Sequence, residues 1–299
     1  MIFHRIQAWL IACLMLAGHP ALAAEPPNPN RELRIGADLS AFPNQLRADL
    51  EITLRYWAEE LGQQAKIPTH VQVYETANEI MANDFRAGRF DLLITSPLQF
   101  VTLLDKSELA DGFKTSQSDL PMDSLVILTQ KDAGYDNFKQ LAGKRIITQK
   151  NAPLPAIYLE TLCAETFQQR CERVLSIAAT EKNADQLIFK LFFGQTDAVI
   201  TNKASFLVAA ELNPQIFKGL QILKELEGVP LNAGYFHVSV PEDFRELVIN
   251  KATNITQFHH GKALLEVFKS DNIARSQVGD LSVVESLYRR YQITRLGKH

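Results

Sequence analysis

Residues 80–101, with the sequence IMANDFRAGRFDLLITSPLQFV, constrain the fold more than any other part of the chain. Their first apolar residues recur at helical spacing, and Gly88 then supplies a helix stop. Residues 92–94 form an apolar run of strand length, and Ser96 before Pro97 is typical of an N-cap and the first residue of a new helix. The passage therefore predicts a helix, a buried strand and a second helix. The end of such a strand presents backbone N–H groups and hydroxyls to a surface that favours an anion.

A second passage repeats this pattern. GRFDLLITS at residues 88–96 and GQTDAVITN at residues 194–202 share Gly, Asp, Ile and Thr in register. Two interpretations are open. The repeat is either the helix, glycine and strand pattern that any α/β protein shows, or a sign that the chain has two similar lobes that face a shared cleft. In the second interpretation the ligand site includes the strand ends, because ligands of open α/β sheets bind there. These ends are Thr95, Ser96, Thr201 and Asn202, whereas Asp91 and Asp197 precede the strands and should serve turns or caps.

The first residues differ in character from the rest of the chain. A weakly basic start precedes an apolar run at residues 6–17, and ALA at residues 21–23 matches a small-x-small cleavage pattern. The run is shorter than the ~20 residues that a membrane-spanning helix needs. We therefore expect residues 1–23 to be a signal peptide, removed after Ala23 or Ala24, that exports the protein to the periplasm. A lipoprotein anchored through Cys13 is the alternative, since residues 10–13 resemble a lipobox.

Composition limits the kind of partner. The 299 residues are 46% hydrophobic and 22% charged, which is ordinary for a globular protein and enough for two lobes with real cores. The formal net charge is −3, and it becomes −4 once Arg5 is removed with the leader. A mildly acidic chain has no electrostatic footprint for nucleic acid. Net charge also cannot steer an anionic ligand, so any specificity for an anion must be local.

Two cysteines, Cys163 and Cys171, remain after the leader is removed. An even pair in an exported chain predicts a disulfide around the end of one helix, with two free buried thiols as the alternative. Half of a metal site is disfavoured because no cluster of His or Cys accompanies the pair. We expect no metal and no cofactor.

Signals of catalysis are poor. The chain contains no GxSxG, HExxH, P-loop or GxGxxG motif. His259 and His260 are adjacent and would point to opposite sides of a helix, so they do not converge on one site. Because no nucleophile, base and orienting group come together, we expect a binding protein rather than an enzyme.

Strands and helices alternate along the chain. Strands are expected at residues 33–37, 71–74, 92–94, 125–128, 146–147, 174–178, 198–200, 220–226 and 234–240. Residues 106–123 are polar and are expected to be irregular. The alternation predicts an α/β fold with parallel sheets. We expect a discontinuous first lobe at residues 31–123 plus 235–299 and a second lobe at residues 124–234. The crossings near residues 123–129 and 231–240 would form a hinge on which the lobes close over a central cleft.

Five passages together resemble a known family. They are LRIGADLS, ANDFRAGRFDLLITSPLQFV, LAGKRIITQKNAPLPAIYLETL, FFGQTDAVITNKASFLVA and VPLNAGYFHVSVPEDFRELV. Over nearly all of the mature chain they resemble the type II periplasmic solute-binding proteins, specifically the PhnD-like phosphate- and phosphonate-binding branch attached to ABC transporters. The resemblance implies a small anionic solute as ligand. It also implies a membrane partner, either an ABC permease or, as the alternative, a membrane sensor that responds to the closed form.

One passage departs from the family pattern. In phosphonate-binding relatives the helix after the first strand of the second lobe begins with a Ser-Thr-Ser-Gly-like cluster that holds the oxyanion. Residues 148–153 of this chain are TQKNAP, so the hydroxyl pair is missing, although Lys150 could add charge. We expect a monomer whose ligand-binding residues are Ser40, Thr95, Ser96, Ser124, Lys150, Asn151, Thr201 and Asn202.

Overall fold

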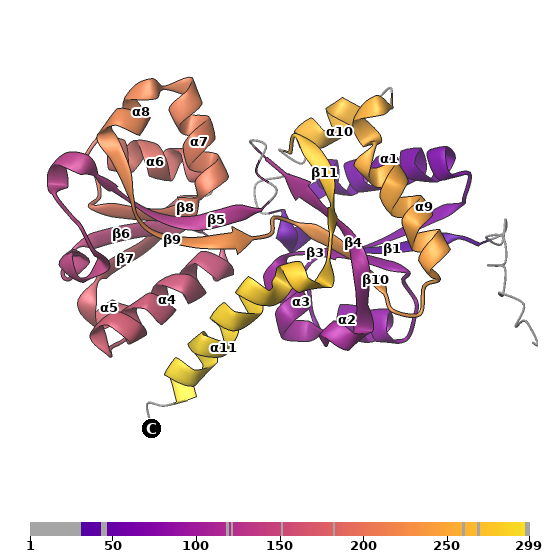
Figure 1. Ribbon diagram of the computed structural model, residues 1–299, viewed down its shortest axis with the longest axis horizontal. Coiled ribbons are helices and arrows are strands. Elements are labelled where there is room, and N and C mark those ends of the chain that lie inside the picture. The colour runs from indigo at the N-terminus through magenta and orange to yellow at the C-terminus, as the bar shows by residue number, and fades with distance from the viewer. Residues whose placement is uncertain are drawn as a thin grey trace, which may run out of the picture.

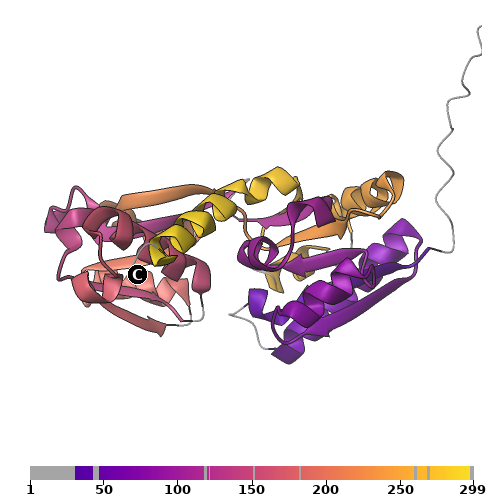
Figure 2. The ribbon, with the colours of Figure 1, turned by 90° about the horizontal axis from the view of Figure 1, so that it is seen from below.

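The structure is a computed structural model. It describes residues 31–42, 47–117, 120, 122–150, 152–181, 183–258, 261–267 and 270–296. The expected signal peptide and Cys13 lie outside the described residues. Two β-sheets with covering helices lie side by side along the long axis of the molecule (Figures 1 and 2). We call each sheet with its helices a lobe. Within the described ranges, no helix is both long and apolar enough to cross a membrane.

The first lobe is built on a six-stranded sheet with the order β2-β1-β3-β10-β4-β11. Pairing is parallel from β2 to β3 and antiparallel from β3 to β11. The strands are β1 (Leu33–Asp38), β2 (Thr69–Tyr74), β3 (Leu92–Thr95), β4 (Leu109–Ser116), β10 (Ala233–His237) and β11 (Asn272–Ser276).

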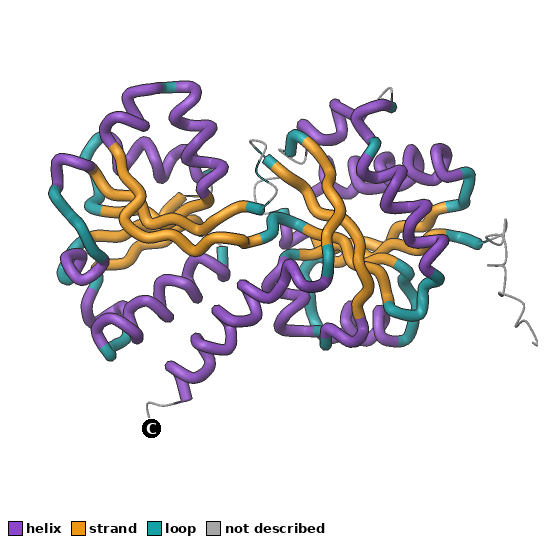
Figure 3. Tube along the Cα trace, viewed as in Figure 1, coloured by secondary structure: helices purple, strands orange, loops and turns teal. Residues whose placement is uncertain are grey.

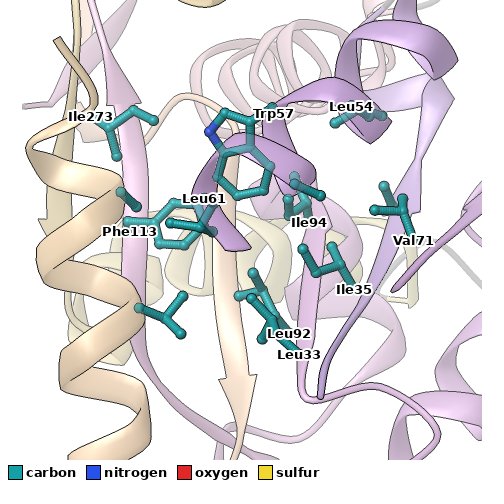
Figure 4. Packing of buried hydrophobic residues seen from close by; sticks show 14 of the residues in the cluster. Leu33, Ile35, Leu54, Trp57, Leu61, Val71, Leu92, Ile94, Phe113 and Ile273 are labelled. Atoms are coloured by element: carbon teal, nitrogen blue, oxygen red, sulfur yellow. The ribbon is translucent and has the colours of Figure 1, made fainter. Parts of the chain in front are cut away.

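Helices cover both faces of this first sheet. One face carries α1 (Arg47–Ala65), α9 (Glu242–Thr253) and α10 (Gly261–Val267), and the other carries α2 (Glu79–Arg86) and α3 (Pro97–Leu103). Trp57 of α1 is 3% exposed, and its ring centroid lies 5.6 Å from that of Phe113 of β4 (Figure 4). On the opposite face, Phe100 of α3 meets Tyr235 of β10 edge-on at 4.9 Å. Both faces of this mixed sheet are therefore buried.

The second lobe contains a five-stranded sheet with the order β7-β6-β8-β5-β9. Its strands are β5 (Asp123–Gln130), β6 (Arg145–Gln149), β7 (Ser176–Glu181), β8 (Ala198–Asn202) and β9 (Leu220–Val229). One face packs against α4 (Pro153–Phe167) and α5 (Cys171–Val174). The other face packs against α6 (Ala184–Phe192), α7 (Lys203–Leu212) and α8 (Pro214–Gly219). Figure 3 shows the strands of the two sheets as separate groups.

The internal repeat of the sequence occupies equivalent places in the two sheets. β3 lies beside β1, and β8 lies beside β6, in both cases with parallel pairing. Gly88 and Gly194 both have positive φ, +67° and +70°, after the preceding helix. Asp91 and Asp197 each bond the backbone of the neighbouring strand, at the end away from the cleft described below. The interpretation as two similar lobes is therefore the correct one.

The chain crosses between the sheets at residues 117–122, after β4, and at residues 230–232, before β10. The crossing expected at residues 123–129 is wrong, because those residues are buried in β5. Half of the other expected passage, residues 231–240, lies in β10. The apolar runs that marked these passages are strands, and the connections between the sheets are the shorter segments beside them.

The C-terminal helix α11 (Ser282–Leu296) contacts both lobes. Val284 and Leu287 are fully buried in the core of the second lobe, together with Leu98 of α3. Glu285 pairs with Lys106 of the first lobe, and Arg290 pairs with Glu165 of α4 at 3.0 Å. Residues 282–296, expected within the first lobe, thus belong to the packing of both.

Two strands of the first sheet were not expected from the sequence. β4 lies within residues 106–123, which are not irregular, and β11 lies in a stretch that carried no strand signal. Lys114 interrupts the apolar pattern of β4, yet it is buried and bonds Asp280 at 2.7 Å. Gly112 is required by close approach, because a Cβ there would lie 2.0 Å from the carbonyl oxygen of Gly234. These are tertiary contacts, which periodicity does not report.

Candidate functional site

A cleft with a volume of about 550 Å³ lies between the lobes. The first lobe lines it with the segment after β1, the start of α3 and the end of β4. The second lobe lines it with the start of β5, the end of β8 and the first turns of α4, α6 and α7. Residues 229–232, at the second crossing, complete the lining. Most of these segments follow the carboxyl ends of parallel strands, where ligands of open sheets bind.

Asp38 organises the part of the cleft that follows β1. Its carboxylate is fully buried and accepts hydrogen bonds from the N–H and the hydroxyl of Ser40, at 2.9 and 2.7 Å. It also accepts a bond from the hydroxyl of Thr95 at 2.9 Å. Ser40 is exposed to the cleft, whereas Thr95 is 1% exposed and stays behind it. Thr95 therefore supports Ser40 indirectly through Asp38.

Ser96 and Gln99 line the cleft from the start of α3. Ser96 is the N-cap, and its Oγ accepts a long bond of 3.4 Å from the N–H of Gln99. The hydroxyl proton of Ser96 is not used in this cap, so it remains available as a donor. The side-chain Oε1 of Gln99 is buried and has no hydrogen-bond partner among the described residues.

Asp123 organises the part of the cleft that belongs to the second lobe. The side chain of this first residue of β5 accepts bonds from Ser124 N at 2.7 Å, from Ala204 N at 3.0 Å and from Nδ2 of Asn202 at 2.8 Å. Burial raises the pKa of the carboxyl group, which is 2% exposed, against the lowering effect of these bonds. Because Ala204 is in the first turn of α7, Asp123 already places a carboxyl group at the positive end of that helix.

The first turns of α4 and α6 border the cleft without side-chain caps. Ala152 precedes α4, and Pro153 and Pro155 carry no N–H, so Ala152 and Leu154 are the donors of this turn. Asn183 makes no capping bond to α6. An oxygen-rich ligand could therefore satisfy N–H groups at α4 that the chain leaves uncapped.

No Lys or Arg side chain is among the described residues that line the cleft, whereas Asp123 and Asp185 are. Lys203, next to Asn202, instead pairs with Glu225 of β9 at 2.9 Å. Burial acts to raise the pKa of Glu225, but the bonds from Lys203 and Ser124 outweigh it and lower that pKa. Among the described lining residues, the cleft offers an anion neutral donors and helix ends, and no side-chain cation.

The cleft brings together three of the residues expected from the sequence, Ser40, Ser96 and Asn202. Four others do not line it: Thr95 bonds Asp38, Ser124 bonds Glu225, Thr201 is 2% exposed, and Lys150 is exposed outside the lining. Asn151 lies outside the described residues. Successive side chains of a strand point to opposite faces of the sheet. The neighbour of a residue that lines the cleft therefore often faces the core.

Sequence reasoning missed Phe42, Gln99, Asp123 and Asn183, which line the cleft. The sequence places Asp123 in the connection between the lobes. Asp123 is instead the first residue of β5, and its place in that strand depends on pairing with the distant strand β9. No sequence signal separates Gln99 from other residues of a short helix.

Cys163 and Cys171 form a disulfide with a Cα–Cα distance of 5.2 Å, which confirms the sequence prediction. It joins α4 to α5 on the face of the second lobe that also contacts α11, away from the cleft lining. In the part of the chain that the structure describes, no three His, Cys, Asp or Glu side chains gather as a metal site would require.

Comparison with solved structures finds proteins of the same fold. PhnD1 of Prochlorococcus marinus in complex with methylphosphonate is 17% identical, with a TM-score of 0.56 over 91% of this chain and 100% of that one. A binding protein component of a phosphonate ABC transporter from Pseudomonas aeruginosa is 11% identical, with a TM-score of 0.55 over 90% and 89%. A Xanthomonas citri protein bound to ATP is 12% identical, with a TM-score of 0.57 over 90% and 99%. No curated protein matches the sequence significantly.

Two α/β lobes around a central cleft define the type II periplasmic-binding fold, as expected from the sequence. The family described as "ABC transporter, phosphonate, periplasmic substrate-binding protein" matches residues 39–280, and this chain belongs to it. The protein is therefore a periplasmic substrate-binding protein for a small solute, with an ABC permease as partner, and not an enzyme.

Proposed function

We propose that this protein captures a small phosphonate- or phosphate-like oxyanion in the cleft and delivers it to an ABC permease. The observation that carries the proposal is that α4 and α6 both begin at the cleft without a side-chain cap. Helix starts present N–H groups and the positive end of the helix dipole, which stabilise an anion without a side-chain cation. The family assignment and the methylphosphonate complex of PhnD1 support the same ligand class.

The individual donors are few, so the ligand must be compact. Ser96 offers a hydroxyl from the first lobe, and Ala152 and Leu154 offer N–H groups from the second. These donors belong to different lobes, so one ligand can contact both only when the lobes approach each other. The crossings at residues 117–122 and 230–232 are the segments about which we expect this closure.

The proposal also covers the processing, oligomeric state, location and lobe boundaries of the protein. The mature protein begins after residue 23, is a monomer and is released into the periplasm, with lipidation of Cys13 as the alternative. Its first lobe comprises residues 31–117 and 233–281, its second lobe comprises residues 123–229, and α11 packs on both. A membrane sensor is the alternative partner to the permease, and it would bind the closed form without transport.

A ligand screen tests the proposal. Thermal unfolding with phosphate, phosphonates, sulfonates, carboxylates and amino acids should show stabilisation by oxyanions, worth about 2.7 kcal/mol at a hundredfold excess over the dissociation constant. Calorimetric titration of the best oxyanion with the Ser96→Ala variant should lose roughly 1–3 kcal/mol of binding, because a donor to a charged oxygen is removed.

The matched control for Ser96→Ala is Asn78→Ala. Asn78 also caps a helix, accepting a bond from Met81 N at 3.0 Å, but it does not line the cleft. Both variants lose about 1 kcal/mol of stability with the cap, and only Ser96→Ala should lose affinity. Binding restricted to neutral or cationic solutes would contradict the proposed function.

A further inference from the structure

The chain passes between the lobes a third time, at the start of α11. Leu281 is fully buried in the core of the first lobe, and Asp280 beside it bonds Lys114 of β4 at 2.7 Å. Val284, three positions further on, is fully buried in the core of the second lobe. Residues 282 and 283 therefore join the two cores in one short step, in addition to the two crossings described above.

α11 is attached more firmly to the second lobe than to the first. Its side chains Val284 and Leu287 are fully buried in the core of the second lobe, and Arg290 pairs with Glu165 of α4 at 3.0 Å. From the first lobe, Leu98 of α3 reaches the same core. Buried apolar side chains contribute more to such an attachment than exposed ion pairs do. We therefore expect α11 to move with the second lobe.

The crossings separate α11 from the cleft. None of the described residues of α11 lines the cleft, whereas residues 229–232 of the second crossing do. Just before that crossing, Gly228 lies against α11, because a Cβ added there would be 3.4 Å from Cγ2 of Val283. Figure 2 shows α11 along the same edge of the molecule as the ribbons that lead from one sheet to the other.

An ion pair joins the lobes on this far side of the crossings. Glu285 of α11 pairs with Lys106, which lies in the first lobe between α3 and β4. The two side chains are 36% and 38% exposed, and the bond from Lys106 lowers the pKa of Glu285, so the carboxylate is charged at neutral pH. A rotation about the crossings that narrows the cleft widens the space on their far side. Because α11 moves with the second lobe, closure draws Glu285 away from Lys106.

We propose that Lys106 and Glu285 are positioning residues that stabilise the open arrangement of the lobes and thereby set the affinity for ligand from outside the cleft. This inference goes beyond the proposed function, and it holds for a ligand of any class that the closed lobes bind. The apparent affinity of such a protein is the affinity of its closed form multiplied by the closed fraction. Removing an ion pair of this exposure should raise the closed fraction, and the affinity with it, by roughly 2- to 5-fold.

Calorimetric titration with methylphosphonate tests the effect on affinity. Lys106→Met should raise the affinity by roughly 2- to 5-fold. It is a cleaner change than Glu285→Gln, which also removes the partner of Arg289, 3.3 Å away on the same helix. The double variant should gain no more than Lys106→Met, because both substitutions remove the same interaction. A loss of stability would not imitate this result, because the readout is a gain of affinity.

Glu165→Gln is the matched control on the same helix. It removes the ion pair of Arg290, whose two side chains are 42% and 39% exposed, but which joins α11 to α4 within the second lobe. Since closure does not separate this pair, the affinity of Glu165→Gln should equal that of the unaltered protein. An equal gain of affinity in Glu165→Gln would overturn the inference, because any loosening of α11 would then have the same effect.

A distance measurement tests the same inference without ligand. Thr76 and Lys150 are exposed and follow the carboxyl ends of β2 and β6, in different lobes, so closure shortens the distance between them. Spin labels on Thr76→Cys and Lys150→Cys meet no other free thiol in the mature chain, because Cys163 and Cys171 form the disulfide. In pulsed electron paramagnetic resonance of the ligand-free protein, Lys106→Met should increase the short-distance population by roughly 2- to 5-fold.

The two measurements separate this inference from the proposed function. An unaltered distance distribution in Lys106→Met, or an affinity equal to or below that of the unaltered protein, would overturn the inference and leave the proposed function standing. If neither phosphate nor methylphosphonate bound to the unaltered protein, the proposed function would fail. The ligand-free distance distribution would still decide whether Lys106 and Glu285 hold the lobes open.

Discussion

Removing the Asp91 carboxylate should destabilise the protein more than removing that of its repeat counterpart, Asp197. The Asp91 side chain is 3% exposed and accepts three bonds from Arg34, through its N, Nε and Nη2 atoms at 3.0, 3.0 and 2.9 Å. It also pairs with Arg31 at 3.2 Å. Asp197 is 31% exposed, accepts one bond from Arg145 N at 2.8 Å and has an ion-pair distance of 3.7 Å to Arg145 Nε.

The contrast in geometry sets the size of the two effects. Removing one partner of a buried ion pair costs about 3–5 kcal/mol, but the Arg34 side chain is 39% exposed and water can solvate the charge left behind. We therefore expect Asp91→Ala to lower the free energy of unfolding by about 2–3 kcal/mol. Asp197→Ala loses one backbone hydrogen bond and a weak, exposed ion pair, so about 1 kcal/mol is expected.

Urea unfolding measures both effects, with the first lobe followed separately. Of the two tryptophans in the chain, Trp9 is in the expected leader, so the fluorescence of the mature protein comes from Trp57 in the core of the first lobe. The Trp57 transition should move to lower urea in Asp91→Ala, with circular dichroism reporting both lobes. An Asp197→Ala protein destabilised as much as Asp91→Ala would refute the argument from burial. So would an Asp91→Ala protein within 0.5 kcal/mol of the unaltered one, a difference typical of surface substitutions.

Four further outcomes are expected. Cys163 and Cys171 should resist alkylation without reductant, and labelled thiols would contradict the disulfide. Reduction should lower the free energy of unfolding by about 2.5 kcal/mol for a sequence separation of 8. Burial raises the pKa of Asp123 above its ordinary 3.8. The stability that the protonated carboxyl group contributes is therefore complete below pH 3.8 and is lost as pH rises through the raised pKa. In urea unfolding at a series of pH values, Asp123→Asn should flatten the dependence of the free energy of unfolding on pH over that range. Leu287→Ala should cost about 2–5 kcal/mol, because the side chain is fully buried between α11 and the second lobe; a smaller loss by urea unfolding would show that α11 packs loosely. Saturating methylphosphonate should reduce the radius of gyration in small-angle scattering, and an unchanged value would contradict closure about residues 117–122 and 230–232.

The elements that the sequence predicted best carry their signals locally. α3 begins after its N-cap Ser96, and α4 begins at Pro153, as the capping and proline rules indicate. The positive φ of Gly88 and Gly194 follows from the same helix-stop pattern that revealed the repeat. β4 and β11 were missed because their signals are not local. Lys114 is tolerated in a buried strand only because Asp280, far along the chain, pairs with it.

The site was harder to predict than the fold, because its chemistry depends on the direction of hydrogen bonds. A serine and an asparagine at strand ends suggested donors to an anion, and both residues do line the cleft. Yet Ser40 donates its one hydroxyl proton to Asp38, and Asn202 donates one of its two amide protons to Asp123. The buried carboxyl groups of Asp38 and Asp123 therefore reduce the number of donors that the cleft offers. The residue types at the surface of the cleft predict a small anionic ligand. Which of these atoms can donate a hydrogen bond depends on buried partners from other elements, and the local sequence does not reveal those partners.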